Sequence, residues 1–557
     1  MKQTISLLSA VAAVLLTGCG KQKAFVSDNF AVSPTPLEYV AGEVPATISI
    51  NVPAKVMPKK ATVACTPVLK WNGGAAAGDP FTLQGEKVEA NNTIISYKSG
   101  GHATMRFCVP FQEGMEKSEL FMQFTAHKGK KVLKMPTVKI GYGTQYTAAL
   151  ITRTAKTANF GLAPDNFQRV ISQKQEAAVK FLIGQANLRG SELNSQTIQD
   201  FIKTLKNIKN DEESLVLNNI EVSAYASPDG SYSLNEKLAE KRSSVSEGYV
   251  NQQLKQQKLA TNVDTKFTAE DWEGFQALVT ASNLPDKDII LRVLSMYEDP
   301  EQREREIRNV AIVYKELADA VLPELRRARM VINYDVIGRS DDAILALVDS
   351  DPSKLSLEEL LYAANILATS DTQKQSILNN AIKYYPNNYR AYNNLGMLAM
   401  QQGDNDSAQR YLRQALGIDA NAPEPNVNLG MLALQNGQFK DAEMYIAKGV
   451  GANNLEEALG HLYVAQGKYN QASAKFAKSV NNSAALAYIL AQEYAEAGKT
   501  LTNIKNPDAT TYYLRAILAA RMQQSADVKE NLAKAIALDP SLTQRAANDA
   551  EFSDYNK

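Results

Sequence analysis

Hydrophobic and polar positions follow two different periods along this chain. Between residues 31 and 155, short runs alternate between apolar and polar side chains and are separated by Pro and Gly, as at 61–71, 103–109 and 132–140. Such alternation is typical of strands that bury one face. About six of these runs in succession predict an all-β sandwich.

From 355 to 545 the apolar positions recur at helical spacing, and the pattern itself repeats. The six residues that begin at Asn394, Asn-Leu-Gly-Met-Leu-Ala, return unchanged at Asn428, an offset of 428 − 394 = 34 residues. A 34-residue period with small residues where paired helices cross is the signature of tetratricopeptide repeats. We therefore expect an all-α solenoid in which each helix pair packs on the next.

In such a stack the first helix of each pair lines a concave surface. The repeat positions place a set rich in amides and methionines there: Arg390, Asn393, Asn394, Met397, Asn428, Met431 and His461. An Asn amide can pair with both the donor and the acceptor of a peptide group, and Met adapts to varied side chains. We expect this groove to bind an envelope protein or a peptide from one. The alternative is that these residues only pack between repeats.

The 22 residues from Glu221 to Arg242 join an alternating strand, a Pro-Asp-Gly turn at 228–230 and a helix that carries Asn235. Asn-x-x-Leu-x-x-x-Arg after a strand and a Gly turn resembles the OmpA-like domain, which binds the peptidoglycan stem peptide in the periplasm. Further similarity at 271–274 and 322–334 extends the resemblance over roughly residues 176–336. It implies an α/β domain with a long helical insertion.

The resemblance also implies a peptidoglycan site. Its arginine is Arg242, whose guanidinium would pair with a carboxylate of the stem peptide, and Asn235 would belong to the same motif. The acid that this family places 15 residues earlier falls at Ser227, which has no charge, and Asp229 stands two residues further on. The alternative is that Arg242 is a scaffold residue in a domain that has lost its ligand.

The start of the chain resembles a bacterial lipoprotein signal. A basic start and an apolar run are followed by Leu16-Thr17-Gly18-Cys19, which implies removal of residues 1–18 and lipidation of Cys19. The apolar run is too short to cross a bilayer core of about 30 Å as a helix. Basic rather than acidic residues follow Cys19, which favours the periplasmic face of the outer membrane over the cell surface.

Composition and motifs mainly exclude classes of function. Lys+Arg and Asp+Glu are both 60, so no net charge attracts nucleic acid. The three His are scattered, and no hydrolase or metalloprotease motif occurs, so we expect no metal site, no cofactor and no catalytic activity. Cys65 and Cys108 lie in strand-like runs. They predict either a disulfide or two buried thiols.

The sequence thus predicts a multidomain protein: a signal peptide at 1–18, a tether at 19–30, the β-sandwich at 31–155, the OmpA-like domain at 165–336, a linker at 337–354 and the solenoid at 355–545. The predicted function is that of a lipid-anchored, periplasm-facing adaptor in envelope assembly or secretion. The alternative is a structural tether that binds peptidoglycan.

Overall fold

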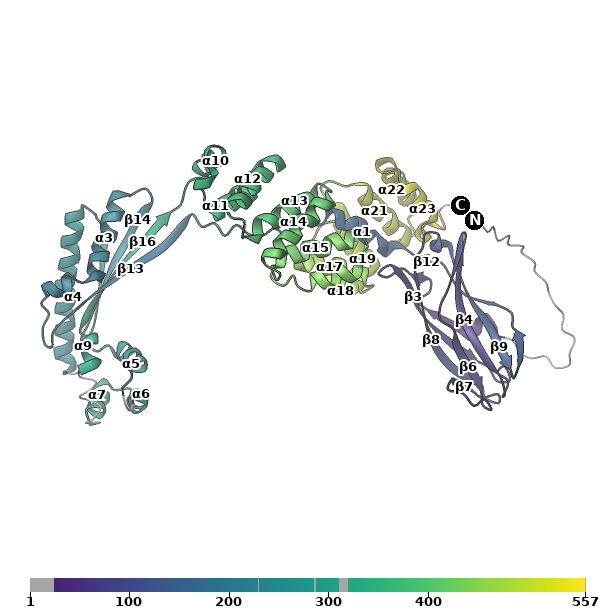
Figure 1. The fold of residues 1–557 in the computed structure, drawn as a ribbon, viewed down its shortest axis with the longest axis horizontal. Helices are drawn as coiled ribbons and strands as arrows, with labels where there is room; N and C mark the ends of the chain where they lie inside the picture. The colour runs from purple at the N-terminus through teal and green to yellow at the C-terminus, as the bar shows by residue number, and fades with distance from the viewer. Residues whose placement is uncertain (1–24, 229, 285–286, 310–318, 556–557) are drawn as a thin grey trace. The chain divides into compact units, whose positions relative to one another are not determined.

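The computed structural model describes residues 25–228, 230–284, 287–309 and 319–555. The predicted signal peptide, Cys19 and Asp229 lie outside the described residues. The chain forms two compact units (Figure 1), one made of the residues up to Asp165 together with those from Ala368 onward, and one made of Asn166–Leu367. The predicted tether ends early, because Phe25 is buried and stacks on Phe124 with ring centroids 4.8 Å apart.

The amino-terminal part of the first unit is β-rich, as predicted. A three-stranded antiparallel sheet consists of β1 (Phe30–Ser33), β3 (Glu43–Val52) and β8 (Gly101–Pro110). A larger sheet has the order β10 (Lys131–Lys134), β9 (Glu119–Lys128), β4 (Thr62–Trp71), β6 (Phe81–Gly85) and β7 (Thr93–Ile95), with β11 (Val138–Tyr142) added to β9 and β5 (Gly74–Ala77) to β4. The inward residues of both sheets share one hydrophobic core.

The two cysteines do not form the disulfide that was considered. Cys65 lies on β4 and is buried, whereas Cys108 lies on β8 and is exposed, and neither thiol is bonded to another. Side chains alternate between the faces of a strand, and on β8 it is Phe107 that is buried, so Cys108 faces outward. The expectation of two buried thiols therefore holds for Cys65 only.

A short parallel pairing joins β2 (Leu37–Glu38) to β12 (Thr144–Gln145). After β12 the chain leaves the β-rich region through η3 (Thr147–Ala149), α1 (Leu150–Thr154) and η4 (Ala155–Thr157), and then continues without regular structure to Asp165. We call residues 146–165 the strap. The sequence placed its first half in the predicted sandwich, but the strap packs against the solenoid, where α1 is the blue helix among green ones in Figure 1.

The second unit contains a four-stranded sheet in the order β13 (Val170–Lys180), β16 (Arg327–Ile337), β14 (Leu215–Tyr225) and β15 (Asn262–Thr268). β14 and β15 are parallel, and the other pairs are antiparallel. Helices α3 (Gln196–Asn210) and α4 (Tyr232–Gln257) share a core with one face of this sheet. Residues such as Ile220 and Val222 are therefore buried, while the intervening Glu221 is exposed.

Helices between β15 and β16 form a separate small core, as expected of a helical insertion. They are α5 (Trp272–Ala281), α6 (Lys287–Met296), α7 (Pro300–Asn309) and α9 (Leu322–Leu325), and their buried residues form their own cluster. The predicted linker at 337–354 differs from expectation. It contains α10 (Asp341–Ser350), which Ser340 caps by accepting a hydrogen bond from the Ala343 amide. The remaining elements of this unit are α2 (Gly190–Leu193), α11 (Leu357–Tyr362) and a π-helical turn at Ala363–Leu367.

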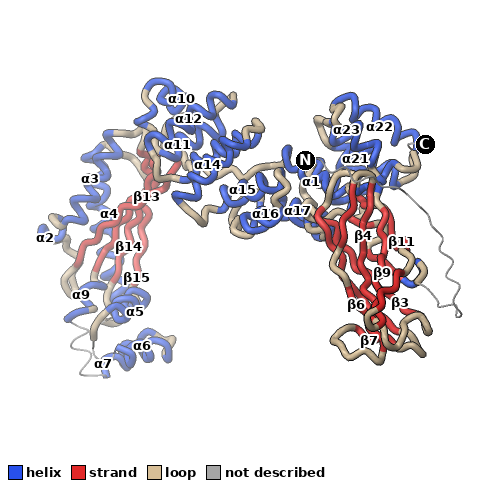
Figure 2. The backbone as a smooth tube through the Cα atoms, turned by 45° about the vertical axis from the view of Figure 1, so that its right-hand side comes forward, coloured by secondary structure: helices blue, strands red, loops and turns tan. Residues whose placement is uncertain are grey.

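The carboxy-terminal part is the predicted all-helical solenoid. Its helices are α12 (Asp371–Tyr384), α13 (Tyr389–Gln401), α14 (Asn405–Ile418), α15 (Pro423–Gln435), α16 (Phe439–Ile446), α17 (Leu455–Ala465), α18 (Tyr469–Lys475), α19 (Asn482–Leu490), α20 (Tyr494–Asn503), α21 (Ala509–Arg521), α22 (Ser525–Leu538) and α23 (Leu542–Asn548). Figure 2 contrasts these blue helices with the red strands of the β-rich part. None of the helices in the described ranges has the length and apolarity to cross a membrane.

The repeated glycines mark where paired helices cross. A Cβ on Gly396 would lie 2.7 Å from Leu412 Cγ, and one on Gly430 would lie 2.5 Å from Ile446 Cγ1. Because these distances are far below a normal carbon contact, only glycine lets the helices approach this closely. This packing explains the 34-residue recurrence of glycine in the sequence.

Candidate functional site: the concave surface of the solenoid

The first helices of the repeats carry polar side chains that are buried, although they would be exposed to solvent if the groove were empty. Asn393, Asn394 and Asn428 each have an exposed fraction of 0%. Buried amides require hydrogen-bond partners. Their partners are in the strap, so the structure brings together the asparagines that the sequence assigned to the groove.

Asn428 pairs with both sides of the Gly161 residue. The Gly161 amide donates to Asn428 Oδ1 at 2.7 Å, and the Gly161 carbonyl accepts from Asn428 Nδ2 at 2.8 Å. The same carbonyl accepts a second hydrogen bond, from Asn393 Nδ2 at 2.9 Å. The amide and the carbonyl of Gly161 are thus both paired with side chains of the solenoid.

Asn394, one repeat earlier, forms the same pair of hydrogen bonds with Ala163. The Ala163 amide donates to Asn394 Oδ1 at 2.9 Å, and its carbonyl accepts from Asn394 Nδ2 at 3.1 Å. Residues two apart in an extended chain present their peptide groups to the same side. Equivalent asparagines in successive repeats therefore each hold one residue of the strap, which runs toward the earlier repeats.

Further contacts hold both ends of residues 159–165, and we call the solenoid side chains that hold this part of the strap the clamp. Near its start, Asn159 accepts at its carbonyl from Asn454 Nδ2 at 3.0 Å and donates through Nδ2 to Glu457 Oε2 at 2.9 Å. At its end, Arg390 Nη1 donates to the Asp165 carbonyl at 3.0 Å. The sequence had not predicted Asn159, Asn454 or the strap carbonyls as members of the site.

Apolar side chains of the strap complete the solenoid core. Ile151 is fully buried and Phe160 is 8% exposed, and both belong to the same hydrophobic cluster as Met397 and Met431. The expectation of an open, methionine-lined groove for another protein is therefore not met. The groove holds a segment of this chain, and the two methionines are core residues.

Gly161 lies too close to the asparagines of the solenoid for a larger residue to take its place. A Cβ at this position would lie 2.8 Å from Asn454 Oδ1 and 3.3 Å from Asn428 Oδ1. A side chain would therefore separate the strap from the asparagines. The repeat positions indicated the asparagines of this site, whereas the sequence analysis did not identify the strap.

His461 lies beside the clamp but does not hold the strap by a hydrogen bond. Its Nδ1 is 2.8 Å from the Glu457 carbonyl, and its ring packs edge-on against Phe476 with centroids 5.1 Å apart. Burial lowers the pKa of His461, and its Nε2 has no hydrogen-bond partner among the described residues. The ring is therefore a neutral core group.

The second unit places Arg242 away from any open surface. It is fully buried, and it donates from Nε to the Gln185 carbonyl at 3.0 Å, from Nη1 to the Tyr225 carbonyl at 2.9 Å and from Nη2 to the Leu182 carbonyl at 3.2 Å. Its guanidinium also lies 5.1 Å from the Phe181 ring centroid. These contacts tie α4 to the end of β14 and to the loop after β13.

Asn235 and Ser227, which the sequence placed in the same site, also have partners within this unit. Asn235 is buried and donates from Nδ2 to the Gly230 carbonyl at 2.9 Å. Ser227 Oγ accepts from Arg326 Nε at 3.1 Å. The described residues contain no group of three or more His, Cys, Asp or Glu side chains that could hold a metal ion.

Comparison with known proteins identifies the repeats. Two tetratricopeptide-repeat family models match residues 377–410 and 399–460. The carboxy-terminal region of this chain therefore carries tetratricopeptide repeats, which fit a role in protein–protein interaction. Among curated proteins, none matches this sequence significantly.

Several solved structures are similar to this chain. A tetratricopeptide repeat protein from Parabacteroides merdae is 15% identical over 36% of this chain and 85% of its own, with a TM-score of 0.27. PilW, a type IV pilus biogenesis factor, is 18% identical over 36% of this chain and 92% of its own, with a TM-score of 0.26. PilF of Pseudomonas aeruginosa is 17% identical over 38% and 96%, with a TM-score of 0.26.

Proposed function

We propose that this protein is a protein-interaction scaffold of the bacterial envelope, lipid-anchored through Cys19 at the periplasmic face of the outer membrane, in assembly or secretion. The observation that carries the proposal is that Asn428 pairs with the amide and carbonyl of Gly161 and Asn394 with those of Ala163. Pairing with the main chain gives affinity for an extended segment whatever its side chains.

Because the segment held in the groove belongs to the same chain, the groove serves assembly of the scaffold itself. The strap fixes the β-rich region to the solenoid, and Arg390 on α13 holds the last strap residue, Asp165. The chain returns from the inserted 166–367 unit directly into α12, which packs on α13. Partner proteins, in this proposal, bind the assembled scaffold and not the filled groove.

The lipid anchor has a direct test with a matched control. Cys19→Ala is expected to move the protein from the membrane fraction to the soluble fraction, or to leave it unprocessed. Cys108→Ala, at an exposed cysteine of β8, is expected to leave fractionation unchanged. Normal processing and membrane association of the Cys19 variant would refute the lipoprotein assignment.

The scaffold role is tested by partner capture after in-cell cross-linking. Asn428→Ala removes a strap contact, whereas Asn426→Ala removes a buried asparagine of the same helix that donates only to the Ala420 and Ala422 carbonyls. We expect envelope proteins to be lost from the Asn428 variant and retained by the Asn426 variant. Recovery of the same proteins with both variants would contradict a role for the assembled scaffold.

Peptidoglycan tethering is a second candidate, supported by the strand-turn-helix order of β14 and α4 around Arg242. It ranks lower because three donors of the Arg242 guanidinium already serve main-chain carbonyls. The guanidinium is also fully buried, so this unit would have to open before a stem-peptide carboxylate could reach it. Sedimentation of the full-length protein with purified sacculi, in competition with free stem peptide, tests this candidate, and failure to sediment would eliminate it.

A further inference from the structure

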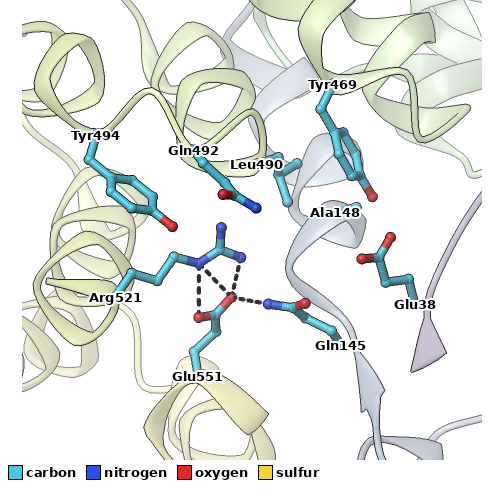
Figure 3. A pocket seen from close by; sticks show the side chains of 9 residues that line it. All are labelled: Glu38, Gln145, Ala148, Tyr469, Leu490, Gln492, Tyr494, Arg521 and Glu551. Atoms are coloured by element: carbon cyan, nitrogen blue, oxygen red, sulfur yellow. Dashed lines mark hydrogen bonds and ion pairs between the residues drawn. The ribbon is translucent and has the colours of Figure 1, made fainter. Parts of the chain in front are cut away.

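A polar cavity lies where the β-rich region meets the last repeats of the solenoid. Its volume is about 300 Å³. Separate segments of the chain line it (Figure 3), including Glu38 of β2, Gln145 of β12, Tyr469 and Tyr494 at the starts of α18 and α20, Arg521 of α21 and Glu551 of the 3-10 turn η7 (Ala550–Phe552). The cavity is distinct from the clamp that holds residues 159–165.

Arg521 and Glu551 neutralise each other within the wall of the cavity. Arg521 Nη2 lies 2.6 Å from Glu551 Oε1, and Arg521 Nε lies 3.1 Å from Glu551 Oε2. Arg521 Nη1 donates to the Ile489 carbonyl at 2.7 Å. Burial disfavours ionisation of Glu551, but the hydrogen bonds and charge of Arg521, together with hydrogen bonds from Thr147 and Gln145, outweigh it and lower the pKa of this carboxyl. The pair is therefore charged and internally satisfied.

Glu38 is left as the uncompensated charge among the lining residues. Its carboxylate forms no hydrogen bond or ion pair within the part of the chain that the structure describes, and burial raises its pKa against the attraction of Arg521. In Figure 3 the Tyr469 hydroxyl points toward this carboxylate. Burial and then the charge of Glu38 raise the pKa of Tyr469, so the phenol stays neutral.

We propose that this cavity binds a primary alkylammonium group, with Glu38 as its counter-ion and the ring of Tyr469 as the wall beside it. A partly desolvated carboxylate without a partner is unfavourable, and a bound cation relieves that cost. Tyrosine rings attract cations through their faces. An anion is excluded because the donors of Arg521 are directed at Glu551 and the Ile489 carbonyl.

The ammonium could belong to a free diamine or to a lysine side chain of a protein. Titration of the full-length protein with cadaverine and, separately, with Nα-acetyl-lysine amide distinguishes the two, and pentan-1-ol serves as the uncharged analogue. We expect at least one amine to bind, no binding of the alcohol, and a tenfold or greater loss of affinity in Glu38→Gln. Preference for cadaverine would indicate a free amine, and preference for the lysine derivative would indicate a protein ligand.

A matched control separates the cavity from general charge effects. Glu43→Gln removes an exposed glutamate of β3 and is expected to leave amine affinity unchanged. Glu38→Gln conserves side-chain size, and an unchanged melting temperature confirms that its fold is intact. Absence of binding by both amines, equal affinity in the Glu38 variant, or equal binding of pentan-1-ol would overturn the proposal. It does not depend on the scaffold function.

Discussion

Replacing Asn428 with Ala tests whether the solenoid holds the strap by pairing with its main chain. In the wild type, Asn428 accepts from the Gly161 amide and donates to the Gly161 carbonyl, and it also donates to Asn393 Oδ1 at 3.0 Å. Truncation leaves the Gly161 amide without an acceptor inside a buried site. The Gly161 carbonyl keeps its hydrogen bond from Asn393.

The cost of this change follows from those contacts. An orphaned buried donor costs about 1–3 kcal/mol, and one further lost hydrogen bond costs about 1 kcal/mol. Opening of the strap should therefore become easier by about 2–4 kcal/mol. Since about 1.4 kcal/mol is a factor of ten, amide hydrogen exchange in residues 159–163 should accelerate by roughly 30- to 700-fold. Exchange mass spectrometry of the full-length protein measures this directly.

Asn426→Ala provides the control, because this buried asparagine lies on the same helix and donates its hydrogen bonds to the Ala420 and Ala422 carbonyls, which are not in the strap. It should destabilise its own repeat while leaving the relative protection of residues 159–163 unchanged. If hydrogen exchange in the strap accelerated equally in both variants, the strap would open only when the whole solenoid opens. Unchanged protection in Asn428→Ala would refute the clamp.

Three further predictions concern packing, pH and the second unit. Gly430→Ala should lower the free energy of unfolding by about 1–3 kcal/mol, because the added methyl group overpacks against Ile446. Gly417→Ala should stabilise α14, because a Cβ there meets nothing within 4 Å. Thermal unfolding of the two variants measures both effects. Burial lowers the pKa of His461, so its contribution to stability is present above about pH 6.5 and lost as pH falls through its folded pKa. In urea unfolding at pH 7.5 and 5.5, the free energy of unfolding should therefore change less with pH in His461→Gln than in the wild type. Arg242→Ala should cost more than about 3 kcal/mol, since hydrogen bonds of a charged group contribute about 1.5–3 kcal/mol each, and hydrogen exchange should rise in the 166–367 unit alone.

The solenoid was predictable because its physics is local and repeated. Gly396 and Gly430 recur at the offset of the repeat, and each lies where the Cβ of any other residue would meet the paired helix. The alternation at 103–109 likewise predicted a strand, which the structure contains as β8. The alternation did not tell which face of this strand is buried. In the structure Phe107 faces the core and Cys108 faces outward, so the two cysteines form no disulfide.

The occupant of the groove could not be predicted from the sequence. Asn394 and Asn428 indicated a surface that pairs with an extended peptide, and this chemistry is what the structure contains. The peptide itself, however, has no periodic pattern, and Gly161 is 267 residues from Asn428 in the sequence. Hydrogen bonds to a main chain leave no trace in the side chains of the bound segment, apart from the need for a small residue such as Gly161.

The covalent connection between strap and groove determines which ligands the groove can hold. Between them lies the inserted unit, with 367 − 165 = 202 residues, and the entropic cost of closing a loop grows only slowly with its length. Effective concentrations of tethered ligands reach the millimolar range for short flexible linkers and fall for longer ones. Against a strap at even about 0.1 mM, a separate peptide of equal intrinsic affinity at about 1 µM would occupy the groove in roughly one molecule in a hundred. The same contacts that suit the groove to peptide binding therefore reserve it for the strap, and a partner protein gains more from binding surfaces that the strap leaves open.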